Sequence, residues 1–122
     1  MIGSTRNVRV WAYTAPMDLR KGYDGLYGTI IRHMGKNPLC GDCFLFTNRN
    51  RKRAKVLLWD GTGLCIFMKR LEKGHFAKLW QKGDGSSLEM TISELALFLE
   101  GSPMVGRIPL SPEKFMLYSV DR

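Results

Sequence analysis

Five basic side chains fall within seven residues near the middle of the chain: Arg49, Arg51, Lys52, Arg53 and Lys55. No acidic residue lies between Asp42 and Asp60. Arginine and lysine are the side chains that bind phosphate, and arginine can also read the edge of guanine. Five contacts to duplex DNA would give a log–log salt slope of about −4.5. The block therefore predicts a nucleic-acid contact, with a solvated turn between two strands as the alternative.

Two smaller basic groups flank this block: Arg20 and Lys21 precede it, and Lys69, Arg70 and Lys73 follow it. Residues 1–82 hold 16 Lys and Arg against 5 Asp and Glu, a charge of +11. Residues 83–122 hold 3 against 6, a charge of −3, which accounts for the net charge of +8. This asymmetry favours nucleic acid or another acidic partner for the first part of the chain. A basic surface that only keeps the protein in solution is the alternative.

The acidic side chains form no recognisable catalytic pattern. Asp60 lies in Trp59-Asp60-Gly61-Thr62-Gly63, a turn in which its carboxylate is expected to accept backbone hydrogen bonds, with Trp59 in the core. Asp18 and Asp24 are expected at a helix cap and in a turn. A nuclease needs at least two carboxylates around Mg²⁺, so only a fold that brings Asp18, Asp24, Asp42 and Asp60 together would supply one. We predict no catalytic residue and keep a metal-dependent nuclease as a remote alternative.

The three cysteines indicate neither a metal site nor a redox site. Cys40-Gly41-Asp42-Cys43 has the spacing of a zinc-binding pair, but the other candidate ligands, Cys65, His33 and His75, stand at no diagnostic spacing. The pair precedes an apolar strand pattern and not a helix, as a thioredoxin-like motif would require. The sequence therefore predicts no metal and no cofactor.

Hydropathy patterns predict the elements that carry the basic block. Alternation predicts a strand over residues 7–13, and helical spacing predicts a helix over 22–34, with Asp18 as its cap. Further strands are predicted over residues 43–47, 54–59, 64–71 and 75–80, followed by a polar loop over 83–87. Thr91 and Glu94 have the capping-box spacing of a second helix that ends before Gly101. The order of strand, helix, β-meander and helix predicts an α+β domain with a largely antiparallel sheet.

Apolar side chains on these elements are expected to fill the core. The aromatic residues on predicted strands are Trp11, Phe44, Phe46, Phe67, Phe76 and Trp80, and stacking on bases is the alternative role for any that are exposed. Residues 95–99 are apolar around nearly the whole helix. That segment is expected to be either fully buried or partly used in an interface, with a second copy or with another protein.

The chain is expected to hold one domain, residues 1–103, followed by an extension, residues 104–122, that forms a short helix or a tail. The longest apolar run, residues 95–99, is far shorter than the roughly 20 residues of a membrane span. Residues 1–7 lack the apolar core of a signal peptide. We expect a cytoplasmic protein with no membrane partner.

The order of these motifs resembles one family, the small TnpB (Orf2-like) accessory proteins of the bacterial insertion sequences numbered sixty-six. The resemblance extends over about residues 10–101 and is strongest in Asp18-Leu19-Arg20-Lys21-Gly22 and Trp59-Asp60-Gly61-Thr62-Gly63. The residues that match the family pattern are Asp18, Gly22, Gly25, Trp59, Asp60, Gly61, Gly63, Leu71, Glu72, Gly74 and Phe76. The chain departs from the pattern at residues 77–80, which lack the usual proline, and at Leu19, where the family usually has Met.

The resemblance implies an accessory role in the transposition of an insertion sequence, without catalysis, beside a separate transposase. The expected partners are the DNA of the element ends and the transposase of the same element, and a homo-oligomer is a further expectation. A protein-interaction adaptor that does not bind DNA is the main alternative. DNA binding predicts a salt-sensitive loss of affinity when Arg49, Arg51 and Arg53 become alanine, whereas an adaptor predicts concentration-dependent association.

Overall fold

The strands of the computed structural model, which describes residues 8–80 and 87–101, form one sheet in the order β4-β3-β2-β1-β5. Their bounds are β1 Val10–Tyr13, β2 Cys43–Thr47, β3 Arg53–Trp59, β4 Leu64–Arg70 and β5 Ser87–Met90. β1 and β2 are parallel, whereas β1–β5, β2–β3 and β3–β4 are antiparallel. The predicted α+β fold with a largely antiparallel sheet is thus confirmed. The predicted extension, residues 104–122, lies outside the described residues.

A helical crossover joins the two parallel strands, as a parallel pair requires. It consists of α1 (Tyr23–Thr29), which continues as a π-helical segment η1 (Ile30–Met34). The predicted extent of this helix is confirmed, but the predicted cap is wrong. Gly22 occupies the N-cap position without a side-chain hydrogen bond, and the Asp18 carboxylate instead accepts from the backbone N–H of Arg20 at 3.0 Å. An Asp side chain readily accepts a hydrogen bond from the backbone N–H two residues later. α1 begins only at Tyr23, so its first N–H groups lie further along the chain from Asp18.

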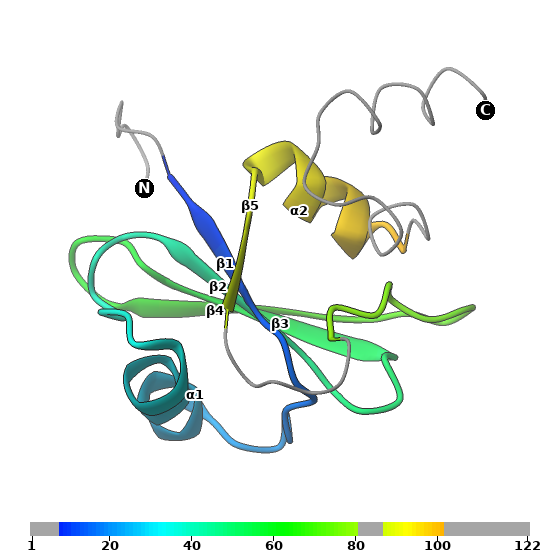
Figure 1. Ribbon diagram of the computed structural model, residues 1–122, viewed down its shortest axis with the longest axis horizontal. Helices are drawn as coiled ribbons and strands as arrows, with labels where there is room; N and C mark the ends of the chain where they lie inside the picture. The colour runs from blue at the N-terminus through cyan, green and yellow to red at the C-terminus, as the bar shows by residue number, and fades with distance from the viewer. Residues whose placement is uncertain (1–7, 81–86, 102–122) are drawn as a thin grey trace.

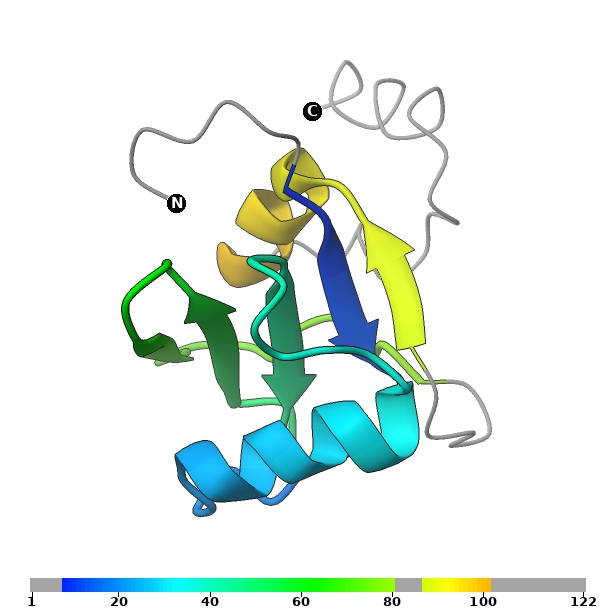
Figure 2. The ribbon, with the colours of Figure 1, turned by 90° about the vertical axis from the view of Figure 1, so that its left-hand side faces the viewer.

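The helices cover opposite faces of the sheet, with α1 on one face and α2 (Ile92–Leu99) on the other (Figure 1). Leu26 and Ile30 of α1 pack with Phe44 and Phe46 on the first face. Every residue of β2 is buried, because this strand lies in the middle of a sheet that is covered on both sides. Figure 2 shows α1 running across the ends of the strands beneath the sheet.

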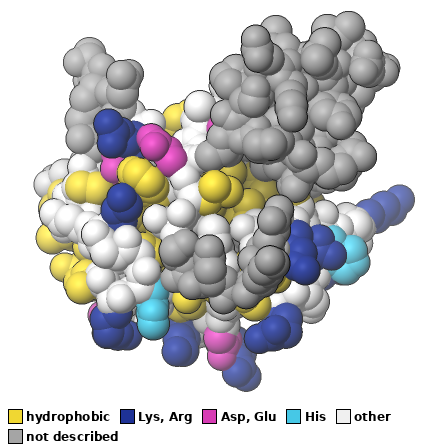
Figure 3. Space-filling view, viewed as in Figure 1, with side chains coloured by type: hydrophobic (Ala, Val, Ile, Leu, Met, Phe, Trp, Pro, Cys, Tyr) yellow, Lys and Arg dark blue, Asp and Glu magenta, His cyan; other side chains and the backbone are white. Residues whose placement is uncertain are grey.

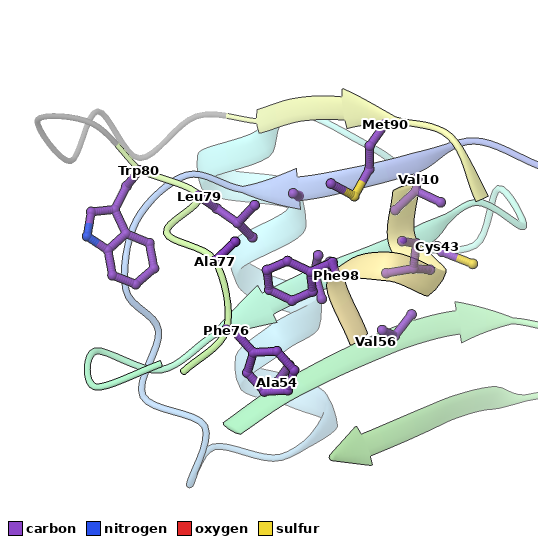
Figure 4. Packing of buried hydrophobic residues seen from close by; sticks show 13 residues of the cluster. Val10, Cys43, Ala54, Val56, Phe76, Ala77, Leu79, Trp80, Met90 and Phe98 are labelled. Carbon is purple, nitrogen blue, oxygen red and sulfur yellow. The ribbon is translucent and has the colours of Figure 1, made fainter. Parts of the chain in front are cut away.

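Residues 75–80, which we call the strap, cover the second face together with α2. Phe76, Ala77, Leu79 and Trp80 are all buried, and the rings of Phe76 and Phe98 stack with their centroids 5.1 Å apart (Figure 4). The predicted strand over these residues is therefore wrong, because the segment has no regular secondary structure. Its apolar side chains pack against the core as a cover and add no strand to the sheet.

The C-terminal elements agree only partly with the sequence prediction. Residues 83–86 of the predicted loop lie outside the described residues, and Ser87 begins β5, a strand that was not predicted. The capping box is confirmed: Thr91 Oγ1 accepts from Glu94 N–H at 3.1 Å, and Glu94 Oε1 accepts from Thr91 N–H at 2.7 Å. Within the described residues, no helix is long and apolar enough to cross a membrane.

Candidate nucleic-acid interface

A groove of about 730 Å³ opens between the β2–β3 loop and the segment that leads into α1. Its polar lining is formed by Asp18, Arg20, Asn48, Arg49, Asn50 and Arg53, and its apolar lining by Pro16, Met17, Leu19 and Met68. We call this the basic groove. It brings together two basic groups that are far apart in the sequence, the one at Arg20 and the one at Arg49 to Arg53. The structure thus gives these arginines a shared concave surface.

Asn48 shapes the loop that carries the first basic group. Its Oδ1 accepts from the backbone N–H groups of Lys52 and Arg53, both at 3.1 Å, and its own N–H donates to the Arg53 carbonyl at 3.1 Å. These bonds close a tight loop in which the Arg49 side chain is exposed and the Lys52 side chain is half-buried. Arg49 and Arg53 therefore remain accessible to a ligand in the groove.

Arg51 has a structural task within the same loop. Its backbone is left-handed, with φ of 60°, and its guanidinium Nη1 donates to the Phe76 carbonyl at 3.2 Å. The Phe76 N–H donates to the Arg51 carbonyl at 2.7 Å. Arg51 thus joins the basic loop to the strap, so replacing it would disturb the loop as well as remove a charge.

The segment after β4 contacts this loop through backbone and side-chain polar groups. Leu71 N–H donates to the Lys52 carbonyl at 2.8 Å, and His75 Nδ1 lies 2.8 Å from the Asn50 carbonyl oxygen. Gly74 has φ of +72°, in the left-handed region that favours glycine, so the chain can turn between these contacts. The family-pattern residues Leu71, Gly74 and Phe76 therefore position the basic loop.

The opposite wall of the groove is held by an ion pair. Arg20 donates to Asp18 through Nε at 2.9 Å and through Nη2 at 2.8 Å. Hydrogen bonds from the Arg20 side chain, and then from its backbone, hold the pKa of the Asp18 carboxyl well below its usual range. Lys55 Nζ donates to the Lys21 carbonyl at 3.3 Å, which joins this wall to β3. Arg20 itself is exposed, with its guanidinium fixed in orientation by Asp18.

The strand register decides which remaining basic residues share this face. Arg53 pairs with Arg70, and Lys55 pairs with Met68 of the groove. Lys69 pairs with Ala54, whose side chain lies in the core on the α2 side, so alternation directs Lys69 to the other face. Arg70 forms an ion pair with Glu72, with Nε and Oε2 3.1 Å apart, and Lys73 is exposed in the following turn, outside the groove. Figure 3 shows Lys and Arg side chains along the lower side of the molecule, where Figure 1 places α1.

The Asp60 turn lies at the other end of β3 from the basic loop. Asp60 Oδ1 accepts from the backbone N–H groups of Thr62 at 2.8 Å and Gly63 at 2.9 Å, which confirms the structural role predicted for it. These bonds lower the pKa of Asp60 to about 2. Gly61 has φ of +105°, which accounts for a glycine at this position. Trp59 is only half-buried, so the prediction of a core tryptophan holds in part.

The charge of Asp60 is expected to stabilise the fold in a pH-dependent way. Its folded-state pKa of about 2 lies below the value of about 3.9 for an unfolded chain. The stabilisation is thus fully present above about pH 4 and is lost as the pH falls through about 2. Asp60→Asn retains an acceptor oxygen without the charge, so the urea midpoints of the two proteins should differ at neutral pH and converge in acid. A difference that does not change with pH would contradict this account.

The other acidic and cysteine side chains do not gather into a site. Asp42 accepts from the Arg9 N–H at 3.3 Å and from the Trp11 indole N–H at 3.1 Å, on the β1 side of the sheet. Asp24 is exposed in the first helical turn of α1, so the prediction that it lies in a turn outside the helix is wrong. Burial raises the pKa of the Cys43 thiol, and no disulfide links the three cysteines. In residues 8–80 and 87–101, no three His, Cys, Asp or Glu side chains lie close enough together to hold a metal ion.

The aromatic side chains are mostly core residues, as expected. Phe44, Phe46 and Phe76 are fully buried, and Trp80 is 9% exposed. Trp11 is half-buried, and Lys36 Nζ lies 3.5 Å from the centroid of its ring. Phe67 is the exception, at 54% exposed on the edge strand β4.

Sequence reasoning missed the residues that complete the basic groove. No local sequence pattern assigns these residues to a binding site: Asn48, Asn50, Pro16 and Met68. They become neighbours of the arginines only through the β2–β3 loop and the register of β4. Met68 is 57% exposed although it lies within an apolar strand pattern, and only the register assigns it to the groove face.

The fold and the groove together define a small α+β protein with one strongly basic face. The family model described as "IS66 Orf2 like protein" matches residues 8–106, and the chain belongs to this family. It is 36% identical over 101 residues to the uncharacterized protein y4hO of Sinorhizobium fredii, covering 83% of this chain and 86% of that protein. It is 33% identical over 101 residues to the uncharacterized protein y4jC of the same organism, covering 83% and 85%. No solved structure gives a significant match. Family membership assigns the chain an accessory role in the transposition of an insertion sequence.

Proposed function

We propose that this protein is a non-catalytic accessory factor that contacts the DNA of its insertion sequence through the basic face around the groove. The observation that carries the proposal is the convergence of Arg20, Arg49 and Arg53 on one groove. Lys55 and Arg70 extend the same face along β3 and β4. Arginine forks match the geometry of phosphate oxygens, and a cluster of cations on one face favours contact with a polyanion.

The positions of the acidic residues support a binding role over a nuclease role. Asp18 is paired with Arg20, Asp42 accepts from Trp11, and Asp60 accepts from its own turn. Asp42 precedes β2 and Asp60 follows β3 at the same end of this antiparallel pair, whereas Asp18 lies near the other end of β2, where the Met17 N–H donates to the Thr47 carbonyl. The three carboxylates thus do not converge on one point, whereas two-metal nucleases need carboxylates around ions about 4 Å apart.

The direct test is a fluorescence-anisotropy titration of the protein against a duplex from the element end and against a scrambled duplex. We expect binding that weakens as salt is raised, with a log–log slope of about −3 to −5 for a face of this size. Tighter binding to the element end would indicate sequence reading in addition to phosphate contact. Failure to bind either duplex near physiological salt would refute the proposal.

The edge strand β4 favours one alternative, an adaptor that binds another protein. β4 is the last strand of the sheet formed by the described residues, and Phe67 is 54% exposed on it. An exposed edge with an apolar side chain can add a strand from a partner, such as the transposase or a second copy of this chain. By contrast, Leu95 and Phe98 of α2, which could have formed an interface, are buried in the protein's own core.

Phe67 gives the adaptor reading its own test. If β4 pairs with a second copy, sedimentation velocity should show association that rises with concentration and is abolished by Phe67→Arg. Phe67→Arg adds positive charge on the face opposite the groove, so it should leave DNA affinity unchanged or slightly higher. A monomer at all accessible concentrations that also fails to bind the transposase would refute the adaptor reading.

A further inference from the structure

The basic groove is concave and partly apolar, and contact with the backbone of a duplex requires neither property. Phosphates of a duplex lie on a convex ridge, which a flat or gently curved basic surface can follow. The groove has a volume of about 730 Å³, within the range of roughly 300–1,000 Å³ that is typical of pockets for small ligands. A concave site of this size is large enough to hold a single nucleotide.

The groove is lined by both basic and apolar side chains. Arg49 and Arg53 come from the loop and the start of β3, and both are exposed. Met68 is 57% exposed in the adjoining strand, next to the Lys55 position in the β3–β4 register. An exposed methionine within a basic face adds nothing to phosphate binding, but its polarizable thioether packs well against an aromatic ring. The groove thus offers both a phosphate-binding part and a part suited to a base.

The Arg20–Asp18 ion pair makes the two walls of the groove chemically different. Asp18 remains ionised because its pKa is lowered by Arg20, so its charge makes that wall a weaker phosphate site than Arg49 and Arg53. The two hydrogen bonds to Asp18 hold the Arg20 guanidinium in a fixed plane, at 2.9 and 2.8 Å. A guanidinium whose charge is balanced in this way can stack on a base, as arginine planes do in nucleic-acid complexes. A phosphate is therefore favoured at Arg49 and Arg53, and a base near Arg20 and Met68.

We propose that the basic groove binds one unpaired nucleotide of a DNA strand, with its phosphate at Arg49 and Arg53 and its base between Arg20 and Met68. This inference rests on the proposed function, because it needs a protein that meets DNA on this face. It goes further in naming the ligand as an unstacked nucleotide, which a DNA end or an opened duplex supplies and an intact duplex does not. Binding such a nucleotide would direct the protein to places where the element's DNA is broken or melted.

Three DNA probes of equal phosphate count separate the two proposals. The first is a blunt duplex, the second carries a short unpaired overhang, and the third carries the same overhang with abasic sugars. We expect the normal overhang to bind about 5- to 150-fold more tightly than the abasic one, the range that corresponds to stacking of one base. Equal affinity for the normal and abasic overhangs would overturn the nucleotide site while leaving duplex binding intact. Failure to bind all three probes would overturn both proposals.

Adjacent residues of β4 provide a matched pair of variants. Met68→Ala should remove most of the preference for the normal overhang, and Met68→Leu should restore part of it. Phe67→Ala, in the same strand with nearly equal exposure, 54% against 57%, should leave the preference unchanged because Phe67 lies on the other face. A preference that survives Met68→Ala, or that is lost equally with Phe67→Ala, would overturn the assignment of the base to this part of the groove.

A fluorescent purine analogue in the overhang gives a readout that does not depend on affinity. Its emission should change on binding to the native protein and not on binding to Met68→Ala at saturating concentration. Emission that stays constant in the saturated complex would overturn the proposal.

Discussion

Substitution of Phe98 by alanine is expected to destabilise the protein by about 3–5 kcal/mol, the range found when a large buried aromatic side chain is removed. Phe98 is fully buried, and its ring stacks on Phe76 at 5.1 Å with an interplanar angle of 11°. Alanine would leave a cavity between α2 and the strap that the surrounding backbone could fill only in part. A typical domain is stable by about 5–15 kcal/mol, so this loss is a large share of the total.

Urea unfolding followed by circular dichroism would measure the Phe98 effect. Ile92→Ala is the matched control, because Ile92 belongs to the same helix but is 49% exposed, and it should cost less than about 1 kcal/mol. Phe98→Leu, which retains part of the volume, should fall between the two variants if Phe98→Ala does not fold. Similar midpoints for Phe98→Ala and Ile92→Ala would show that the core between α2, the strap and the sheet contributes little to stability.

This core also affects the proposed DNA contact. Phe76 donates its N–H to the Arg51 carbonyl and accepts from the Arg51 guanidinium, so the strap and the basic loop are held together. A cavity at Phe98 would loosen the strap and, through it, the loop that carries Arg49. The family-pattern residues from Leu71 to Phe76 therefore serve the groove although none of them lines it.

The elements that were predicted correctly are those whose sequence patterns involve only neighbouring residues. The apolar runs of β3 and β4, the glycine turn after Trp59 and the capping box at Thr91 each depend on residues within a few positions of one another. Asp60 was predicted correctly for the same reason, since its partners Thr62 and Gly63 lie two and three residues on.

Elements that depend on distant partners were not predicted. β5 is four residues long and includes the polar residues Ser87 and Glu89. It forms a strand because it pairs in antiparallel orientation with β1. Residues 75–80 have a strand-like composition but pack as a cover because α2 leaves room beside it for their apolar side chains. The groove could not be predicted, because a shift of β4 by one residue would exchange Met68 with Phe67 and Lys69 with Arg70 between the two faces.

The double variant Arg49→Ala/Arg53→Ala is expected to bind duplex DNA about 60-fold more weakly at about 0.1 M salt. Each phosphate contact contributes about 0.9 to the log–log salt slope, equivalent to about eightfold in affinity between 1 M and 0.1 M salt. Removal of two contacts should therefore flatten the slope by about 1.8. Both side chains are exposed, whereas the Arg51 guanidinium donates to the Phe76 carbonyl and holds the loop to the strap. For this reason Arg51, although basic and adjacent, is left unchanged.

The control for this variant must remove the same charge from a different face. Lys69→Ala/Lys78→Ala does so, because Lys69 lies on the α2 side of β4 and Lys78 is exposed on the strap that covers that side. If binding responds only to net charge, the two double variants should weaken it equally. If the groove face is the interface, as we propose, the lysine variant should retain most of the affinity and nearly the full salt slope. Equal losses would indicate that DNA meets the protein without a preferred face, and the convergence of the arginines on the groove would then have no part in binding.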